Sequence, residues 1–119
     1  MSDPVAVSRR LVAVFAADVE GYSRLMGADE VGTLQGLTDR RAILDKAIAD
    51  HRGRIANTAG DSVLAEFGSA VDAVQCAVTA QAALAEANSS LSPDKRITFR
   101  IGIHVGDVMV RAGTCLAME

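Results

Sequence analysis

The feature that most constrains the fold is a continuous apolar segment near the amino terminus. Residues 11–17 read Leu-Val-Ala-Val-Phe-Ala-Ala, with no polar residue at any alternate position. This pattern predicts a strand over residues 10–17 that is buried on both faces, in the centre of a sheet. Since 50% of the 119 residues are hydrophobic but only 3% are aromatic, we expect one domain whose core is built mainly from aliphatic side chains.

A helical pattern follows over residues 24–51. Glycines at positions 27, 32 and 36 weaken its first half, so we expect a break or two consecutive helices. Gly53 is the predicted carboxyl-terminal cap. The apolar face of this region is formed by residues at roughly helical spacing, namely Leu34, Leu37, Leu44 and Ile48.

The second half of the chain predicts a hairpin, a helix and a strand. Residues 54–58 and 62–67 are short strand segments, and the turn between them places Asp61 near the tip of the hairpin. Ser69 and Asp72 form a start similar to a capping box. The apolar stripe of this second helix is assigned to Val71, Val74, Ala77, Val78 and Leu84. The strand over residues 97–105 turns one face inward, made of Ile97, Phe99, Ile101, Ile103 and Val105.

The order of these elements is strand, helix, strand, strand, helix, strand. This order is typical of the α+β class, and specifically of the ferredoxin-like βαββαβ sandwich, in which both helices cover one face of an antiparallel sheet.

Two aspartates lie beside strand segments in matching contexts. Asp18 directly follows the first apolar segment, and Asp61 lies just ahead of the second strand of the hairpin. Carboxylates at strand ends suit hard divalent cations, because rigid backbone holds the oxygen ligands and leaves positions for phosphate and water. Taken alone, either residue could be an ordinary turn residue, since Gly-Asp is a common turn dipeptide.

Three segments together resemble the catalytic domain of class III nucleotidyl cyclases, the adenylate and guanylate cyclases. Residues 14–23, Val-Phe-Ala-Ala-Asp-Val-Glu-Gly-Tyr-Ser, resemble the first metal motif of the family. Residues 57–67, Asn-Thr-Ala-Gly-Asp-Ser-Val-Leu-Ala-Glu-Phe, resemble the second, and residues 100–108 resemble a later strand. The motifs have the order and spacing of the family and cover residues 9–111, and the resemblance implies the same βαββαβ core.

The resemblance implies a reaction and its ions. The 3′-hydroxyl of a nucleoside triphosphate attacks the α-phosphate, which gives the cyclic 3′,5′-monophosphate and pyrophosphate. Two Mg²⁺ or Mn²⁺ ions suit this chemistry, one at the hydroxyl and one at the triphosphate. By resemblance, Asp18 and Asp61 are the shared ligands, and the backbone carbonyl of Val19 is a further ligand of the ion on the triphosphate side.

Contacts to the triphosphate are expected from the segment Glu20, Gly21, Tyr22 and Ser23, together with Gly60. Backbone amides at the start of a helix bind phosphate oxygens, and Gly21 permits close approach. A plain connecting turn is the alternative reading, and Tyr22 could instead pack against the helix.

Asn57 is the residue expected to contact the base. It lies four positions before Asp61, where adenylate cyclases typically carry lysine and guanylate cyclases glutamate. Asparagine offers a donor and an acceptor, so its chemistry leaves the base open, and a turn-capping role is the alternative. We expect ATP rather than GTP as the substrate.

The family's catalytic domain continues beyond the position of Val110. There it carries a segment similar to Gly-Asp-Gly-Val-Asn, an arginine, and the second base-reading residue; the asparagine and arginine orient the ribose and stabilise the transition state. Residues 112–119 resemble nothing in the family, and residues 1–9 form a leader. In family homodimers each site takes its aspartates from one protomer and its asparagine and arginine from the other. Two copies of these 119 residues are therefore expected to show very low activity or none.

We expect the last residues to be the product of a frameshift. A family continuation Asp-Leu-Leu-Gly-Asp-Gly-Val-Asn, coded GAC CTG CTT GGC GAT GGA GTG AAC, loses its first G and becomes Thr-Cys-Leu-Ala-Met-Glu followed by a stop. That reading reproduces residues 114–119. A natural short homologue is the alternative, and the DNA sequence beyond codon 119 distinguishes the two.

Charge and hydropathy exclude several partners. The net charge of −3 argues against a nucleic-acid partner, and no apolar run reaches the about 18 residues of a membrane span. The first residues show no basic segment followed by an apolar stretch, so we expect no secretory signal. The two cysteines show no metal or disulfide spacing, and a cytoplasmic location is expected. Uncovered sheet edge and apolar surface predict a homodimer or other self-association. Arg40, Arg41 and residues 51–54 are expected to be solvated, or else to form dimer contacts.

Two other classes of function remain open. One is a non-catalytic module that binds metal and nucleotide, or regulates a partner, without making product. The other is a different enzyme with two carboxylates on adjacent strands, such as a polymerase palm or diguanylate cyclase domain. The absence of a Gly-Gly-Asp/Glu-Glu-Phe hairpin counts against the diguanylate cyclase.

Overall fold

A computed structural model describes residues 7–111 and 114–117, with side chains from residue 11 to residue 107. Its elements are β1 (Val7–Val19), α1 (Tyr22–Ala28), α2 (Glu30–Asp50), β2 (Arg54–Ala59), β3 (Ser62–Phe67), α3 (Ala70–Asn88), a 3₁₀ turn (Pro93–Lys95), β4 (Phe99–Arg111) and β5 (Thr114–Ala117). The predicted break in the first helical region is confirmed. Asp29 separates α1 from α2 and caps α2, because its side chain accepts a hydrogen bond from the Gly32 N–H.

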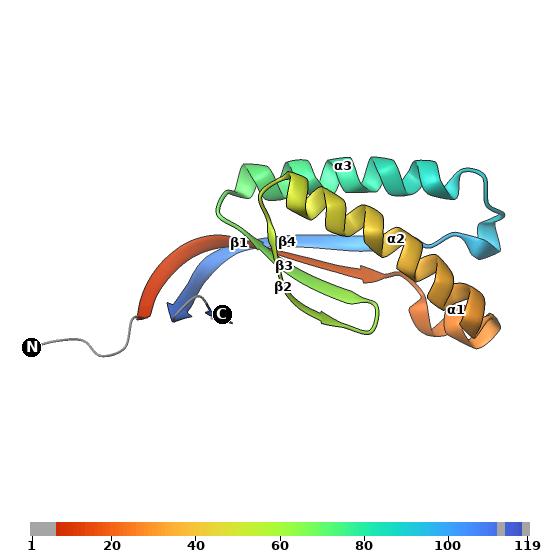
Figure 1. Cartoon of the computed structure of the whole chain (residues 1–119), viewed down its shortest axis with the longest axis horizontal. Coiled ribbons are helices and arrows are strands. Elements are labelled where there is room, and N and C mark those ends of the chain that lie inside the picture. The colour runs from red at the N-terminus through yellow and green to blue at the C-terminus, as the bar shows by residue number, and fades with distance from the viewer. Residues whose placement is uncertain (1–6, 112–113, 118–119) are drawn as a thin grey trace, which may run out of the picture.

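The strands form one antiparallel sheet in the order β2-β3-β1-β4-β5. The first four strands have the predicted ferredoxin-like arrangement, while β5 was not predicted. Helices α2 and α3 lie side by side over the same face of the sheet, and β1 and β4 extend past them as a curved two-stranded arm (Figure 1). Among residues 7–111 and 114–117, no helix lies on the opposite face of the sheet, which we call the open face (Figure 1).

The core lies between the helices and the covered face of the sheet. In β1 the side chains of Phe15, Ala17 and Val19 are buried there, whereas Ala16 is exposed on the open face. The expectation that this strand is buried on both faces is therefore wrong at Ala16, although Val12, on the same face of the strand, is buried. Phenylalanines contribute more than expected, since Phe15 and Phe67 pack with ring centroids 5.6 Å apart.

The predicted apolar stripe of α3 is confirmed at Leu84, which is buried, and at Ala77, which packs against the core, but it is wrong at the three valines. Its buried residues are Ala73, Cys76, Ala80 and Leu84, whereas Val71, Val74 and Val78 are exposed. Small side chains on the inner face let the helix lie close to the sheet. The face with small residues is therefore buried, and not the face with the larger valines.

Three smaller expectations are also corrected. Leu34 is exposed on α2, and Val105 is exposed where β4 begins to leave the helical layer. Arg40 is not a solvated residue: it is buried, and its guanidinium donates to the Asn88 side chain and to the Ala87 carbonyl at the end of α3. Basic groups are favoured at that end of a helix because its last carbonyls lack partners.

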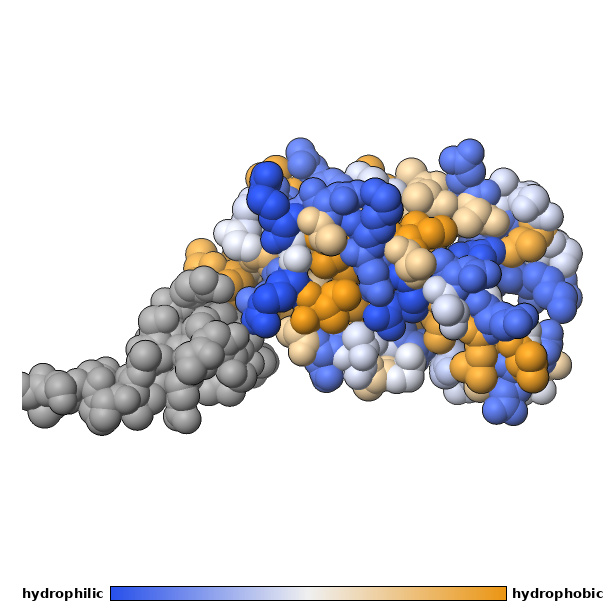
Figure 2. Space-filling view, viewed as in Figure 1, coloured by the Kyte–Doolittle hydropathy of each residue, from blue (hydrophilic) through white to orange (hydrophobic). Residues whose placement is uncertain are grey.

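Hydrophobic residues form several separate patches among hydrophilic ones on the side of the molecule shown in Figure 2. In the part of the chain that the structure describes, none of the helices has both the length and the apolar character that a bilayer span requires.

Candidate functional site

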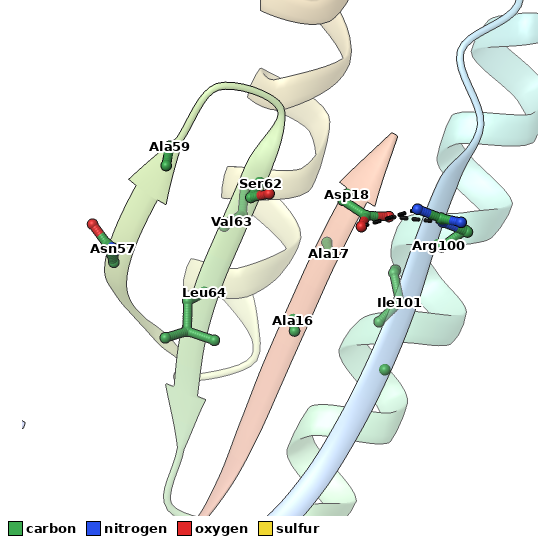
Figure 3. A pocket seen from close by; sticks show the side chains of 11 residues that line it. Ala16, Ala17, Asp18, Asn57, Ala59, Ser62, Val63, Leu64, Arg100 and Ile101 are labelled. Carbon is green, nitrogen blue, oxygen red and sulfur yellow. Dashed lines mark hydrogen bonds and ion pairs between the residues drawn. The ribbon is translucent and has the colours of Figure 1, made fainter. Parts of the chain in front are cut away.

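The open face of the sheet is hollowed where β1, β2, β3 and β4 approach their ends (Figure 3). The hollow has a volume of about 440 Å³. Its lining combines small apolar residues with a few polar ones, namely Ala16, Ala17, Asp18, Asn57, Ala59, Ser62, Val63, Leu64, Arg100, Ile101 and Gly102.

The tip of the β2–β3 hairpin contacts the end of β1. The Val19 backbone N–H donates to Oδ2 of Asp61 at 2.8 Å, which joins positions 42 residues apart. Asp18, Val19 and Asp61 are therefore brought to one end of the sheet, as their assignment to one site requires. Gly60 allows the tight turn, because it has a φ of 57°, in the left-handed region.

Asp18 has a basic partner that the sequence analysis did not identify. Nε and Nη2 of Arg100 donate to its two carboxylate oxygens at 2.9 and 3.1 Å, and the dashed lines in Figure 3 mark these contacts. The hydrogen bonds and charge of Asp18, with smaller contributions from Glu20 and Asp61, raise the pKa of Arg100 above its ordinary value. Three carboxylates thus lie near one guanidinium at this end of the sheet.

The segment assigned to the triphosphate lies beside the hollow. The Glu20 N–H is bonded to the Thr98 carbonyl at 2.8 Å, and Glu20 lines a separate polar pocket with Arg24 and Arg96. Gly21, with a φ of 67°, is the residue at which α1 starts. Ser23 is exposed and Tyr22 packs against the core, which agrees with the packing alternative for Tyr22.

Asn57 reaches the hollow because of an irregularity in β2. The pairing of β2 with β3 shifts between Ile55 and Asn57, so Ile55 is opposite Ala65 while Asn57 is opposite Leu64. A bulge of this kind re-aims the following side chain. It places Asn57 on the open side, at the β2 edge of the hollow (Figure 3).

The donor set suits a hard divalent cation. Two carboxylates and a backbone carbonyl at the end of a strand are oxygen donors of the kind that Mg²⁺ and Mn²⁺ prefer. Among residues 11–107, no three His, Cys, Asp or Glu side chains are grouped so that they could hold one ion. The carboxylates of Asp18, Glu20 and Asp61 all favour the charged form of Arg100.

Arg100 is the residue of this site that sequence reasoning missed, although a signal was present. It opens the third motif, and strand alternation places it on the face opposite Ile101, together with Gly102 and His104. Strand alternation could not identify Asp18 as the partner of Arg100, because this pairing depends on the register between β1 and β4. His104 is exposed.

Comparison with known proteins gives consistent matches. The family model described as "Adenylate and Guanylate cyclase catalytic domain" matches residues 5–115. A curated relative from Rhizobium meliloti (strain 1021), "Putative adenylate cyclase 3", is 47% identical over 106 residues, which are 88% of this chain and 18% of the relative.

Solved structures agree in fold. A crystal structure of an adenylate/guanylate cyclase/hydrolase from Silicibacter pomeroyi is 39% identical, with a TM-score of 0.83 over 94% of this chain and 66% of that one. The adenylyl cyclase CyaB from P. aeruginosa, at 20% identity, shares the fold with a TM-score of 0.72, over 87% of this chain and 59% of that one. The chain thus spans about two thirds of the first structure and about a fifth of the curated relative.

Proposed function

Because the chain belongs to the adenylate and guanylate cyclase catalytic domain family, we propose that it supplies the metal-binding half of a nucleotidyl cyclase active site. The observation that carries this proposal is the bond from the Val19 N–H to Asp61, since it fixes the second aspartate beside the strand end that bears the first.

The proposed ligands are Asp18, Asp61 and the carbonyl of Val19. When bound there, two Mg²⁺ or Mn²⁺ ions would activate the 3′-hydroxyl and neutralise charge on the triphosphate and the departing pyrophosphate. The chain's own contribution is orientation. The Val19 N–H holds one carboxylate oxygen of Asp61, and the paired strands hold the backbone of Asp18, so that the two carboxylates are kept at one end of the sheet.

The remaining contacts follow from charge and shape. Arg100 carries a fork of N–H donors of the kind that binds phosphate oxygens in pairs, and we assign it to the triphosphate with the backbone of residues 20–23 and Gly60. Ala16 and Gly102 have small side chains or none and leave room above the sheet. Asn57, at the far edge of the hollow, is assigned to the base.

In the reaction that this site would serve, the ribose 3′-oxygen forms a bond to the α-phosphorus as the bond to the pyrophosphate oxygen breaks, and the hydroxyl proton is released. The family's asparagine and arginine would complete the site from another protomer. We therefore assign to these 119 residues nucleotide and metal binding with very low or no turnover on their own. ATP is the proposed substrate, since the relative with 47% identity is named as an adenylate cyclase.

Equilibrium binding tests this proposal without requiring turnover. A non-hydrolysable ATP analogue is titrated into the chain with Mn²⁺, and then with EDTA in place of Mn²⁺. We expect D18N and D61N each to weaken Mn²⁺-dependent binding about tenfold or more, because a charged ligand to the ion is lost. Asp39→Asn is the matched control, since Asp39 is an exposed carboxylate on α2. Binding that EDTA does not weaken, or equal losses in D18N and D39N, would contradict the metal site, and tighter binding of the GTP analogue would contradict the assignment to ATP.

A further inference from the structure

The open face of the sheet carries one ion pair that the proposed reaction does not explain. Arg100 donates to both carboxylate oxygens of Asp18, at 2.9 and 3.1 Å. A carboxylate that is to bind a metal ion is therefore fully engaged by a side-chain cation (Figure 3).

The backbone keeps these two side chains together. Asp18 and Arg100 are directly opposite each other in the antiparallel β1–β4 pair, whose register continues from Val7↔Arg111 to Val19↔Phe99 without a shift. Side chains at directly opposite positions are close neighbours on one face of a sheet. The contact therefore follows from the register of the central strands rather than from a mobile loop.

We propose that Arg100 is a built-in competitor of the divalent cation: it occupies the Asp18 carboxylate in the metal-free chain, and metal binding requires this ion pair to open. The inference rests on the proposed function, because it takes Asp18 as a metal ligand.

Charge and geometry both indicate that Arg100 and a divalent cation cannot occupy the Asp18 carboxylate at the same time. A Mg²⁺ ion binds a carboxylate oxygen at about 2.0–2.1 Å and requires near-octahedral surroundings. A guanidinium that is bonded to the same two oxygens leaves too little space for the ion and its other ligands. The two cations also repel each other. Without the ion, the guanidinium offsets the repulsion among the carboxylates of Asp18, Glu20 and Asp61, all of which contribute to its electrostatic environment.

The pair is placed so that it can open. The side chains of Arg100 and Asp18 are 64% and 41% exposed, and exposed ion pairs are held weakly. A released Arg100 remains on the rim of the hollow, where it can bind an anionic ligand. Metal binding at Asp18 and anion binding by Arg100 are then coupled, so that each increases the affinity for the other ligand.

Mn²⁺ affinity of the nucleotide-free chain tests the proposal. Free Mn²⁺ is followed by electron paramagnetic resonance during titration of the wild-type chain and of R100Q. We expect R100Q to bind Mn²⁺ about three- to tenfold more tightly, because the competitor and its charge are removed. R96Q is the matched control: it removes the same charge near the start of β4, but Nε of Arg96 donates to the Leu91 carbonyl rather than to a carboxylate. Its Mn²⁺ affinity should stay within about twofold of wild type.

A lysine variant separates direct occupation from long-range charge. R100K keeps the charge but cannot form the two parallel hydrogen bonds, so its Mn²⁺ affinity should lie between those of the wild type and R100Q. If R100K equals the wild type while R100Q binds more tightly, charge alone acts and direct occupation is overturned. If R100Q binds no more tightly than the wild type, competition is overturned and the proposed function stands. If none of the chains binds Mn²⁺, Asp18 is not a metal ligand and both proposals fail.

The ion pair can also be observed directly by nuclear magnetic resonance. In the nucleotide-free chain, the ¹⁵Nε–H signal of Arg100 should move toward that of a solvated arginine as Mg²⁺ is added, while the signal of Arg96 stays unchanged. A signal that keeps its metal-free position after Mg²⁺ binding is saturated would show that the pair does not open, and would overturn the proposal.

Discussion

At the scale of single residues, position 53 requires glycine because neighbouring side chains leave no space for a Cβ atom. The conformational freedom of glycine is not the reason. A Cβ atom at this position would lie 2.5 Å from Cε2 of Phe67 and 2.9 Å from Cγ2 of Ile48, and both of those side chains are buried in the core. The left-handed conformation at the end of α2 belongs instead to Arg52, with a φ of 65°. The prediction that Gly53 is the helix cap was therefore wrong, and the reason for glycine is packing.

Gly53→Ala should lower the free energy of unfolding by about 1–3 kcal/mol, because the added methyl group overpacks the core. Gly68→Ala is the matched control, since a Cβ at Gly68 meets nothing within 4 Å, and its effect should stay below about 0.5 kcal/mol. Urea denaturation of the two variants measures both values. Equal effects at the two positions would contradict the packing explanation.

Single residues of the candidate site could be predicted from the sequence, but the contacts between them could not. Asp18 and Asp61 were identified because each lies in a recognisable motif beside a strand signal. The hydrogen bond between Val19 and Asp61 and the ion pair between Arg100 and Asp18 were not predicted. These contacts join residues that are 42 and 82 positions apart in the sequence. Such contacts depend on strand register and hairpin geometry, which local patterns do not contain.

At the scale of secondary-structure elements, α3 shows how an apolar pattern can indicate the wrong face. The helix carries valines on one side and mainly small residues on the other, so two faces have apolar periodicity. The face with Ala73, Cys76 and Ala80 is buried, because it permits a short distance between helix and sheet. The strand predicted over residues 62–67 was confirmed as β3, in which Val63, Ala65 and Phe67 are buried.

Paired truncations on α3 test this assignment. Leu84→Ala removes a side chain that is 2% exposed and should cost about 2–5 kcal/mol of unfolding free energy. Val78→Ala removes a side chain that is 65% exposed and should cost less than about 0.5 kcal/mol, since alanine is also the better helix former. Thermal or urea unfolding measures the difference, and a larger loss in Val78→Ala would show that the valine face is the packed one.

At the scale of the whole molecule, the order of elements was sufficient to predict the ferredoxin-like topology, because short right-handed connections leave few alternatives. The placement of both helices on one face of the sheet was predicted with it, and only the expectation that the first strand is buried on both faces was wrong, at Ala16. A continuous apolar strand indicates burial on both sides, yet only one face of β1 is covered by helices (Figure 1). Asp18, Asn57 and Arg100 line the hollow on that uncovered face.

Complementation is the measurement that tests the central claim most directly. The chain is mixed with a full-length cyclase of the family whose two metal aspartates have been replaced by asparagine, and cyclic nucleotide formation from Mg²⁺-ATP is measured. We expect neither protein alone to make product and the mixture to do so, because the chain supplies Asp18 and Asp61 and its partner supplies the asparagine and arginine. The same mixture with the D18N chain should be inactive. If the two proteins co-elute on gel filtration and the wild-type chain restores no more activity than D18N, the chain does not carry the metal-binding half of a cyclase site.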